Sequence, residues 1–285
     1  MSQLVLGTAQ FGDGYGITNA RGRLNDDEVA QIMDLAAESG ITRIDTAMVY
    51  GDALRRLRPW ASAFTFTSKI VGTDPVDPVE QISRSLAELG RDSFDACLIR
   101  EWDLLDSRSK DASIERMAVA RELGLVNRIG VAAYTEEDIH SFAAHMQHAG
   151  QAVGAIQVPA NPLDRRLDSS EYLAAAAAAA GMEVAVRSVF LQGILLVQRG
   201  TRFDSHADVL RYWNHVPEQR SEESLRTCLA HVKALPWVTQ VVVGVSSITE
   251  WRQVLEAWSD CRPSLLPRWL ASNDEGLLDP RLWGP

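Results

Sequence analysis

Short runs rich in apolar residues alternate along the chain with longer amphipathic segments. Each run has the length and composition of a strand that is buried on both faces of a sheet. The segments between the runs are long enough to form helices, and this alternation is typical of βα units built around a parallel sheet. The predicted strands cover residues 3–8, 43–47, 64–70, 95–99, 128–133, 155–159, 183–188 and 240–245.

The amphipathic segments carry apolar residues at helical spacing, and several have recognisable start and stop residues. The predicted helices cover residues 26–39, 76–89, 111–123, 135–149, 169–180, 221–235 and 248–258. The predicted N-caps are Asp26, Thr135 and Thr249, and the glycines that follow predicted C-terminal ends are Gly40, Gly90, Gly124 and Gly181.

Eight successive βα units in about 250 residues are the size of a (β/α)8 TIM barrel, which carries its active site at the C-terminal ends of the strands. A doubly wound open sheet would need a GxGxxG turn after the first strand. Gly12, Gly14 and Gly16 are spaced by two residues and do not match that turn. The sequence therefore predicts one α/β barrel domain over residues 1–285, with a tail from about residue 262 packed across one face.

The charge of the chain limits its ligands. The sequence contains 28 Lys and Arg residues against 38 Asp and Glu residues, a formal net charge of −10. This charge disfavours nucleic acid and anionic membrane surfaces as partners. A small-molecule substrate is expected, and an anionic one must be held by local cations.

Cysteine usage and the N-terminal stretch bear on location. Cys97, Cys228 and Cys261 lie far apart in the sequence and form no CxxC pair, a pattern that fits a reducing compartment. The beginning of the chain lacks the features of a signal peptide, and no apolar run approaches the length of a membrane span. We therefore expect a cytoplasmic protein.

Several polar residues follow the predicted strands at their C-terminal ends. Asp45, Lys69 and Arg100 end the second, third and fourth strands, and Tyr50 follows the second. A nearby ammonium favours tyrosinate, which makes a tyrosine usable as a proton donor near neutral pH. Each residue alone is best interpreted as part of a structural ion pair. Three such residues at successive strand ends predict a catalytic site.

The stretches "IDTAMVYGD" (44–52) and "TSKI" (67–70) resemble the Asp, Tyr and Lys motifs of the aldo-keto reductases, (β/α)8 enzymes that use NADPH or NADH. This resemblance implies that Tyr50 protonates a substrate oxygen, Lys69 favours its ionised form and Asp45 orients Lys69. Other stretches are similar to a bacterial subgroup linked to sugar or secondary-metabolite pathways; they cover residues 7–22, 156–166, 186–196, 242–251 and 279–283.

The resemblance also implies a binding site for a nicotinamide cofactor, NADP or NAD, across the barrel mouth, and it implies no metal. The cofactor-binding residues would be Gln157, Arg187, Ser188, Phe190, Gln192, Gly193, Gly244, Ser246, Ser247 and Arg252. Substrate specificity would depend on the loops 13–19, 100–105 and 196–219, and the predicted substrate-binding residues there are Tyr15, Trp102 and Trp213.

The sequence departs from the family pattern at functional positions. Arg100 stands where the family has a catalytic histidine, and Arg187 stands where many members have a tyrosine that stacks on the nicotinamide. Ala132 and Ala133 replace the usual serine and asparagine that hold the carboxamide, and Glu250 lies where others carry an arginine near the 2′-phosphate. Arginine stays protonated in proteins, so Arg100 cannot join a proton relay, although it can grip a carboxylate or phosphate.

Three hypotheses follow from this pattern. The first is an NAD(P)H-dependent reductase acting on a carbonyl or a conjugated C=C bond of a small anionic metabolite, with Tyr50 as proton donor. The second is a lyase, dehydratase or isomerase without nicotinamide, in which Tyr50 or Lys69 is the base and Arg100 holds an enolate or carboxylate. The third is a protein that senses a cofactor and does not catalyse. The oligomeric state stays open.

Overall fold

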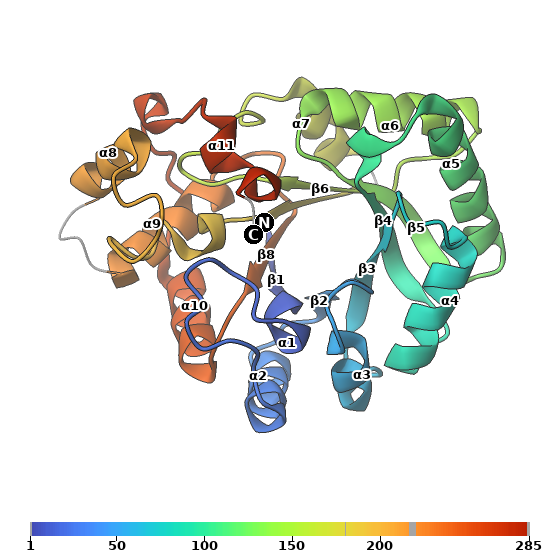
Figure 1. Ribbon diagram of the computed structural model, residues 1–285, viewed down its shortest axis with the longest axis horizontal. Helices are drawn as coiled ribbons and strands as arrows, with labels where there is room; N and C mark the ends of the chain where they lie inside the picture. The colour runs from blue at the N-terminus through green and yellow to red at the C-terminus, as the bar shows by residue number, and fades with distance from the viewer. Residues whose placement is uncertain (1, 180, 217–220, 284–285) are drawn as a thin grey trace.

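The computed structural model describes residues 2–179, 181–216 and 221–283. Eight parallel strands close into a barrel in the order of the sequence, and β1 pairs with β8 to complete the ring (Figure 1). The predicted (β/α)8 fold is confirmed. The strands are β1 (Gln3–Gly7), β2 (Arg43–Asp45), β3 (Thr65–Val71), β4 (Phe94–Arg100), β5 (Val126–Ala132), β6 (Ala155–Pro159), β7 (Glu183–Arg187) and β8 (Gln240–Gly244).

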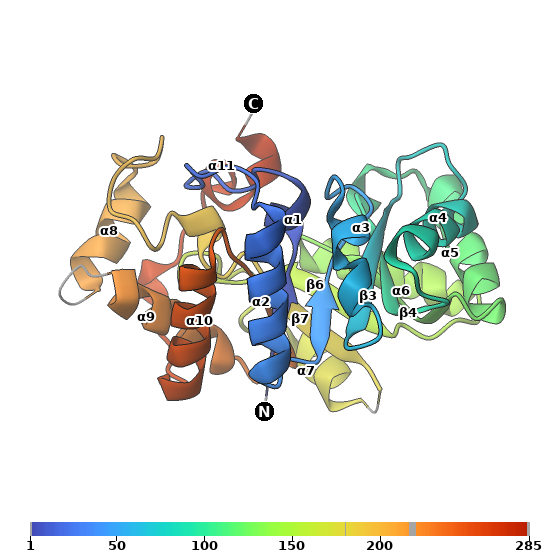
Figure 2. The ribbon, with the colours of Figure 1, turned by 90° about the horizontal axis from the view of Figure 1, so that it is seen from below.

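Helices surround the barrel, and Figure 2 shows them in side view, with α1 and α11 at the end of the barrel opposite the start of β1. The helices are α1 (Ala9–Gly12), α2 (Asp26–Glu38), α3 (Ala53–Leu57), α4 (Pro78–Leu89), α5 (Ser107–Glu122), α6 (Glu136–His148), α7 (Glu171–Ala178), α8 (Ala207–His215), α9 (Ser221–Lys233), α10 (Ile248–Asp260) and α11 (Glu275–Leu278). In the described part of the chain, no helix is both long and apolar enough to cross a membrane.

All seven predicted helices are present, with differences at their ends. Helix α5 begins four residues before its predicted start because the Asp106 side chain accepts a hydrogen bond from the Ser109 N–H and caps it. The short α1, α3, α8 and α11 were not predicted. Ala180, at the end of the predicted helix 169–180, and residues 217–219 of the loop 196–219 lie outside the described residues.

The predicted N-caps were correct at one helix of three. Thr135 caps α6 in a reciprocal capping box with Asp138. At α2 the cap is Asn25, one residue before the predicted Asp26, and at α10 it is Ser247, two residues before Thr249. Each of these side chains accepts a hydrogen bond from the N–H three residues further on, so that the predicted caps lie inside the first helical turn instead.

An ionic cluster lies where the strands begin, at the N-terminal end of the barrel. Arg43 contacts Asp95 at 2.7 Å and Glu183 at 2.9 Å, and Arg128 contacts the same two carboxylates at 2.7 and 3.1 Å. The four side chains come from four different strands. These ion pairs connect the four strands at the N-terminal end of the barrel. TIM-barrel active sites lie at the opposite end.

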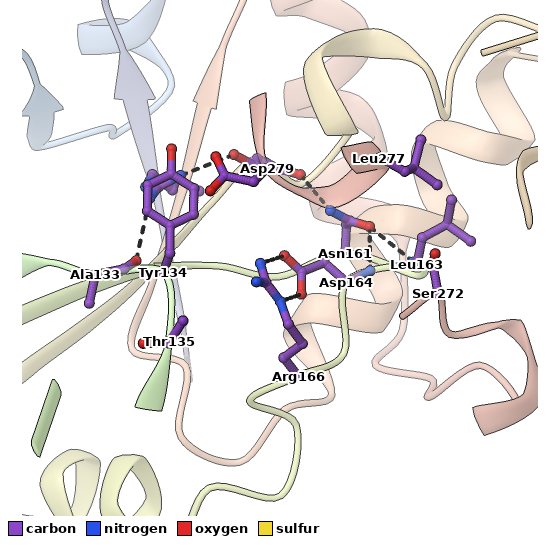
Figure 3. A network of polar contacts seen from close by, with 12 residues as sticks. Ala133, Tyr134, Thr135, Asn161, Leu163, Asp164, Arg166, Ser272, Leu277 and Asp279 are labelled. Atoms are coloured by element: carbon purple, nitrogen blue, oxygen red, sulfur yellow. Dashed lines mark hydrogen bonds and ion pairs between the residues drawn. The ribbon is translucent and has the colours of Figure 1, made fainter. Parts of the chain in front are cut away.

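The segment after α10 reaches the other end of the barrel. The Ser272 N–H donates a hydrogen bond to the Leu163 carbonyl at 2.9 Å, which joins this segment to the loop after β6. Asn161 organises that loop: its Oδ1 accepts from the Leu163 and Asp164 N–H groups, and its Nδ2 donates to the Ser188 carbonyl (Figure 3). The C-terminal segment is thereby held beside the loop that follows β7.

Candidate active site at the barrel mouth

A cavity of about 130 Å³ opens at the C-terminal ends of the strands. Its walls come from the ends of β3 to β7, from the loops after β1 and β2, and from the C-terminal segment. The location is the one at which (β/α)8 enzymes carry their active sites. The cavity is lined by Tyr15, Tyr50, Lys69, Arg100, Glu101, Ala132, Tyr134, Gln157, Arg187 and Arg281.

A buried ion pair forms the floor of this cavity. The Lys69 Nζ lies 2.5 Å from Asp45 Oδ1, and each side chain is only 5% exposed. Gln157 Nε2 donates to the second carboxylate oxygen of Asp45 at 2.7 Å. Burial opposes the charge on Lys69, but the Asp45 carboxylate and Tyr50 outweigh this effect and raise the pKa of Lys69 above its ordinary value. Lys69 is therefore a fixed cation at neutral pH.

Tyr50 lies beside this cation. The Lys69 Nζ is 5.5 Å from the centroid of the Tyr50 ring, and no described residue forms a hydrogen bond with the Tyr50 hydroxyl. A close backbone approach fixes the loop that carries Tyr50: a Cβ at Gly12 would lie 1.7 Å from the Tyr50 carbonyl oxygen. Only glycine fits at position 12, and the hydroxyl of Tyr50 remains available to a ligand.

Arg100 and Glu101 lie at the end of β4 and both line the cavity. The Arg100 side chain is 34% exposed, and its one charged neighbour within 4.0 Å among the described residues is Glu101, at 3.5 Å from Nε. Glu101 has a left-handed backbone conformation, with φ of 62°, and its Oε2 accepts a hydrogen bond from Thr73 at 2.5 Å. Arg100 is thus a cation whose hydrogen-bond donors are largely uncommitted.

Two further arginines meet on the ring of Tyr134. The guanidinium carbon of Arg187 lies 4.1 Å from the ring centroid, and that of Arg281 lies 3.8 Å from it. Arg281 belongs to the C-terminal segment and forms ion pairs with Asp279 at 2.7 Å and Asp103 at 2.8 Å. Arg281 thus links Tyr134 to Asp279, and both of these residues are labelled in Figure 3. The C-terminal segment therefore contributes directly to the wall of the cavity.

The loop after β7 is conformationally unusual. Ser188, Leu191 and Gln192 have φ values of 57°, 47° and 51°, in the region that non-glycine residues seldom occupy. Gln192 joins this loop to the one after β1: its Oε1 accepts from the Ile17 N–H at 3.1 Å, and its Nε2 donates to the Tyr15 hydroxyl at 3.2 Å. Strained backbone held by the surrounding structure is common at ligand sites.

The N-terminus of α10 is satisfied by the chain itself. Ser247 caps the helix by accepting from the Glu250 N–H, and the Glu250 carboxylate accepts from the Ser246 N–H at 2.6 Å. Arg252 is exposed and forms no ion pair with a described residue. A carboxylate therefore already lies at the helix end that the family resemblance assigns to the 2′-phosphate.

The structure brings most of the predicted catalytic group together. Of the predicted site residues, those that line the cavity are Tyr15, Tyr50, Lys69, Arg100, Gln157 and Arg187, with Asp45 directly below. The two tryptophans are not among them. Trp102 is 1% exposed and packs edge-on against Phe142, and Trp213 is buried in α8 against Tyr212. The remaining predicted cofactor residues lie outside the cavity lining. Ser188, Phe190, Gln192 and Gly193 lie on the loop after β7, and Gly244, Ser246, Ser247 and Arg252 lie between the end of β8 and the first turns of α10.

Three lining residues were not among the predicted site residues: Glu101, Tyr134 and Arg281. Glu101 lies in the loop 100–105, which was predicted to contribute to substrate specificity. Glu101 directly follows β4 and Tyr134 lies two residues after β5, and a position next to a strand end was a signal that could have identified them. Arg281 had no such signal, because its place at the cavity depends on how the C-terminal segment folds back across the barrel.

Comparison with known proteins identifies the family. A model of the aldo/keto reductase family matches residues 3–262. The chain belongs to the aldo/keto reductase family. The family is one of oxidoreductases that generally use NAD(P)H. A search of curated proteins found no significant match to this chain.

Solved structures of bacterial aldo-keto reductases share the fold. Aldo-keto reductase AKR11C1 from Bacillus halodurans, in its holo form, superimposes with a TM-score of 0.71 at 19% identity, covering 95% of this chain and 92% of that one. The thermostable aldo-keto reductase Tm1743, in complex with the inhibitor epalrestat, gives 0.66 at 19% identity, covering 94% and 92%. A putative aldo-keto reductase from Pseudomonas aeruginosa, PA4992, gives 0.64 at 19%, covering 90% of each chain.

The buried ion pair generates a prediction on stability. Replacing Asp45 with Asn leaves the Lys69 ammonium buried without a countercharge, so we expect a loss of about 3 kcal/mol or more in the free energy of unfolding. Urea-induced unfolding measures this loss. Asp260→Asn, at an exposed position of α10, should change the free energy by no more than about 0.5 kcal/mol. Equal effects of the two substitutions would contradict the role assigned to the pair.

Proposed function

We propose that this protein is an NAD(P)H-dependent reductase that reduces a carbonyl or a conjugated C=C bond in a small anionic metabolite. The observation that carries the proposal is the cavity, where the free hydroxyl of Tyr50 lies beside a fixed ammonium and an uncommitted arginine faces the same space. Tyr50 beside the ammonium is suited to proton transfer, and Arg100 is suited to binding an anionic group.

Tyr50 is the proton donor in this proposal. When the hydroxyl gives its proton to a substrate oxygen or carbon, the phenolate that remains is stabilised by the Lys69 ammonium beside it. Asp45 and Gln157 hold Lys69 in place from below, through the ion pair and the hydrogen bond to the second carboxylate oxygen. The ammonium is fixed before the reaction begins, so little reorganisation is needed as charge develops.

The charges of the cavity wall support an anionic substrate. The chain has a net charge of −10, yet the lining contains the cations Lys69, Arg100, Arg187 and Arg281 and a single carboxylate, Glu101. Lys69 and Arg281 are each paired with aspartates. Arg100 can therefore hold a substrate carboxylate or phosphate by two parallel hydrogen bonds, in place of the orienting role that the family gives to histidine.

The residues fit a nicotinamide at one end of its expected site and do not fit a 2′-phosphate at the other. The cofactor would supply hydride. Gln157 Oε1 is buried and has no hydrogen-bond partner among the described residues, so it can accept from the carboxamide. Ala132 and Ala133 offer no side-chain group for this purpose, and Glu250 would repel a phosphate at the α10 N-terminus. We therefore favour NADH over NADPH.

A second candidate function is a non-redox lyase, dehydratase or isomerase on the same site. Ala132 and Ala133 favour this non-redox function, because their side chains cannot form hydrogen bonds with a nicotinamide carboxamide. The raised pKa of Lys69 argues against this residue as its base and leaves Tyr50 in that role, with Arg100 holding the enolate. Titration with NADH distinguishes the reductase from the non-redox enzyme, because only the reductase requires saturable binding of NADH. Quenching of the fluorescence of the eight tryptophans reports this binding.

We also propose that the protein acts in the cytoplasm on a small molecule, without a nucleic-acid or membrane partner. All three cysteines are free thiols, and Cys97 and Cys228 are buried. Free thiols of this kind are typical of a reducing compartment.

The role of Tyr50 gives a test on the reaction itself. Tyr50→Phe removes the proton donor but keeps the ring, so we expect kcat/KM to fall by about 10²-fold or more while NADH binding is unchanged. The rate is measured from the absorbance of reduced nicotinamide with panels of aldehydes, ketones and enoyl acids. Tyr172→Phe, on α7 away from the cavity, is the matched control and should leave the rate unchanged. Full activity of the Tyr50 variant would exclude the proposed role.

The role of Arg100 gives a test on the substrate. Arg100→Gln should raise KM for anionic substrates by about tenfold or more and leave KM for neutral aldehydes unchanged, because only the anion loses its charged partner. Arg100→His should shift activity toward neutral carbonyl compounds. Arg108→Gln, at an exposed position of α5, is the control. An equal rise in KM for neutral and anionic substrates would contradict anion binding by Arg100.

A further inference from the structure

Arg100 and Glu101 are consecutive residues that line the same cavity. In an extended strand, consecutive side chains point to opposite faces. The left-handed conformation of Glu101, with φ of 62°, ends the strand alternation after Arg100 and allows both side chains to face the cavity. Such a conformation is unfavourable for a residue with a Cβ, and it persists only where the surrounding structure holds it.

The two side chains leave complementary hydrogen-bonding groups open. Among the described residues, none accepts a hydrogen bond from the Arg100 guanidinium, and its Nε lies 3.5 Å from Glu101 Oε1, beyond a good hydrogen bond. Thr73 holds the other carboxylate oxygen, Oε2, at 2.5 Å. Oε1 itself accepts no hydrogen bond from a described residue. The cavity thus presents donors and a fixed acceptor side by side.

Glu101 also limits which anions can bind. A ligand with only a carboxylate or phosphate gains contacts with Arg100 but brings its negative charge close to the Glu101 carboxylate, and this repulsion opposes binding. A ligand that carries a hydrogen-bond donor next to its anionic group avoids the repulsion, because the donor meets Oε1 while the anion meets Arg100. The 3.5 Å separation of Nε and Oε1 matches groups on adjacent carbon atoms.

We propose that Glu101 is a specificity-determining residue that selects substrates in which a hydroxyl or ammonium group is adjacent to the anionic group, such as hydroxy or amino acids. This inference rests on the proposed binding of an anionic substrate by Arg100 and refines its chemistry. Glu101 touches the substrate directly through Oε1, and Thr73 is a positioning residue that acts through the other oxygen.

The test is calorimetric titration of the full chain with three matched acids: propionate, lactate and alanine. These share a three-carbon carboxylate and carry hydrogen, hydroxyl or ammonium on the second carbon. We expect lactate or alanine to bind at least about tenfold more tightly than propionate, the effect of one hydrogen bond to a charged group. Which of the two is preferred distinguishes a hydroxy acid from an amino acid.

The variants assign the preference to Glu101. Glu101→Leu should remove it entirely, whereas Glu101→Gln should remove the preference for alanine and reduce that for lactate less, because the amide oxygen still accepts. Thr73→Val releases the carboxylate without changing its charge and should weaken the preference. Glu88→Gln, at an exposed position of α4, is the charge-matched control and should leave all three affinities unchanged.

Equal affinities for the three acids, a preference that survives Glu101→Leu, or no detectable binding of any of them would each overturn the inference. The titration contains no nicotinamide. A preference that depends on Glu101 in a protein that never oxidises NADH would refute the proposed reduction and leave the selection by Glu101 intact. Oxidation of NADH with keto acids or enoyl acids, without any preference that depends on Glu101, would refute the selection by Glu101 and leave the proposed reduction intact.

Discussion

The ion pair between Lys69 and Asp45 is the interaction on which the site depends. It lies at the floor of the barrel mouth, almost wholly excluded from water, and joins the ends of β2 and β3. Two buried charges are stable only if they pair with each other. Gln157 from β6 donates a hydrogen bond to the second carboxylate oxygen of Asp45. The result is a positive charge with a fixed position, around which Tyr50, the arginines and the cavity are arranged.

The barrel was predictable from the sequence because its strands are buried on both faces and therefore read as apolar runs. The meeting of Asp45, Lys69 and Arg100 at the barrel mouth was predictable for a related reason: in a closed parallel barrel, residues that end successive strands must meet at one rim. Helix ends were less predictable, since Asp26 and Asn25 are both good caps and only the local backbone decides between them. Thr135 had no such competitor and was identified correctly.

The residues that escaped prediction depend on features that a sequence expresses weakly. The Glu101 side chain would point away from the cavity if the strand continued. The left-handed backbone conformation of Glu101 itself turns the side chain toward the cavity. Arg281 reaches the cavity because the C-terminal segment is tied to the loop after β6 through Ser272 and Leu163. Conversely, Trp102 directly follows Glu101 in the sequence, but its side chain packs against Phe142 and does not line the cavity. An aromatic residue in a barrel loop can face either the cavity or the protein interior, and its position in the sequence does not determine which.

The contact between Gly12 and the carbonyl of Tyr50 has a consequence for how this protein tolerates change. Gly12 does not line the cavity, yet any side chain there would displace the turn that presents the Tyr50 hydroxyl. A substitution at position 12 is therefore expected to move the Tyr50 hydroxyl, although residue 12 lies outside the cavity lining. The functional unit of this enzyme is consequently wider than its cavity, and redesign of the pocket must treat the first helical turn after β1 as part of it.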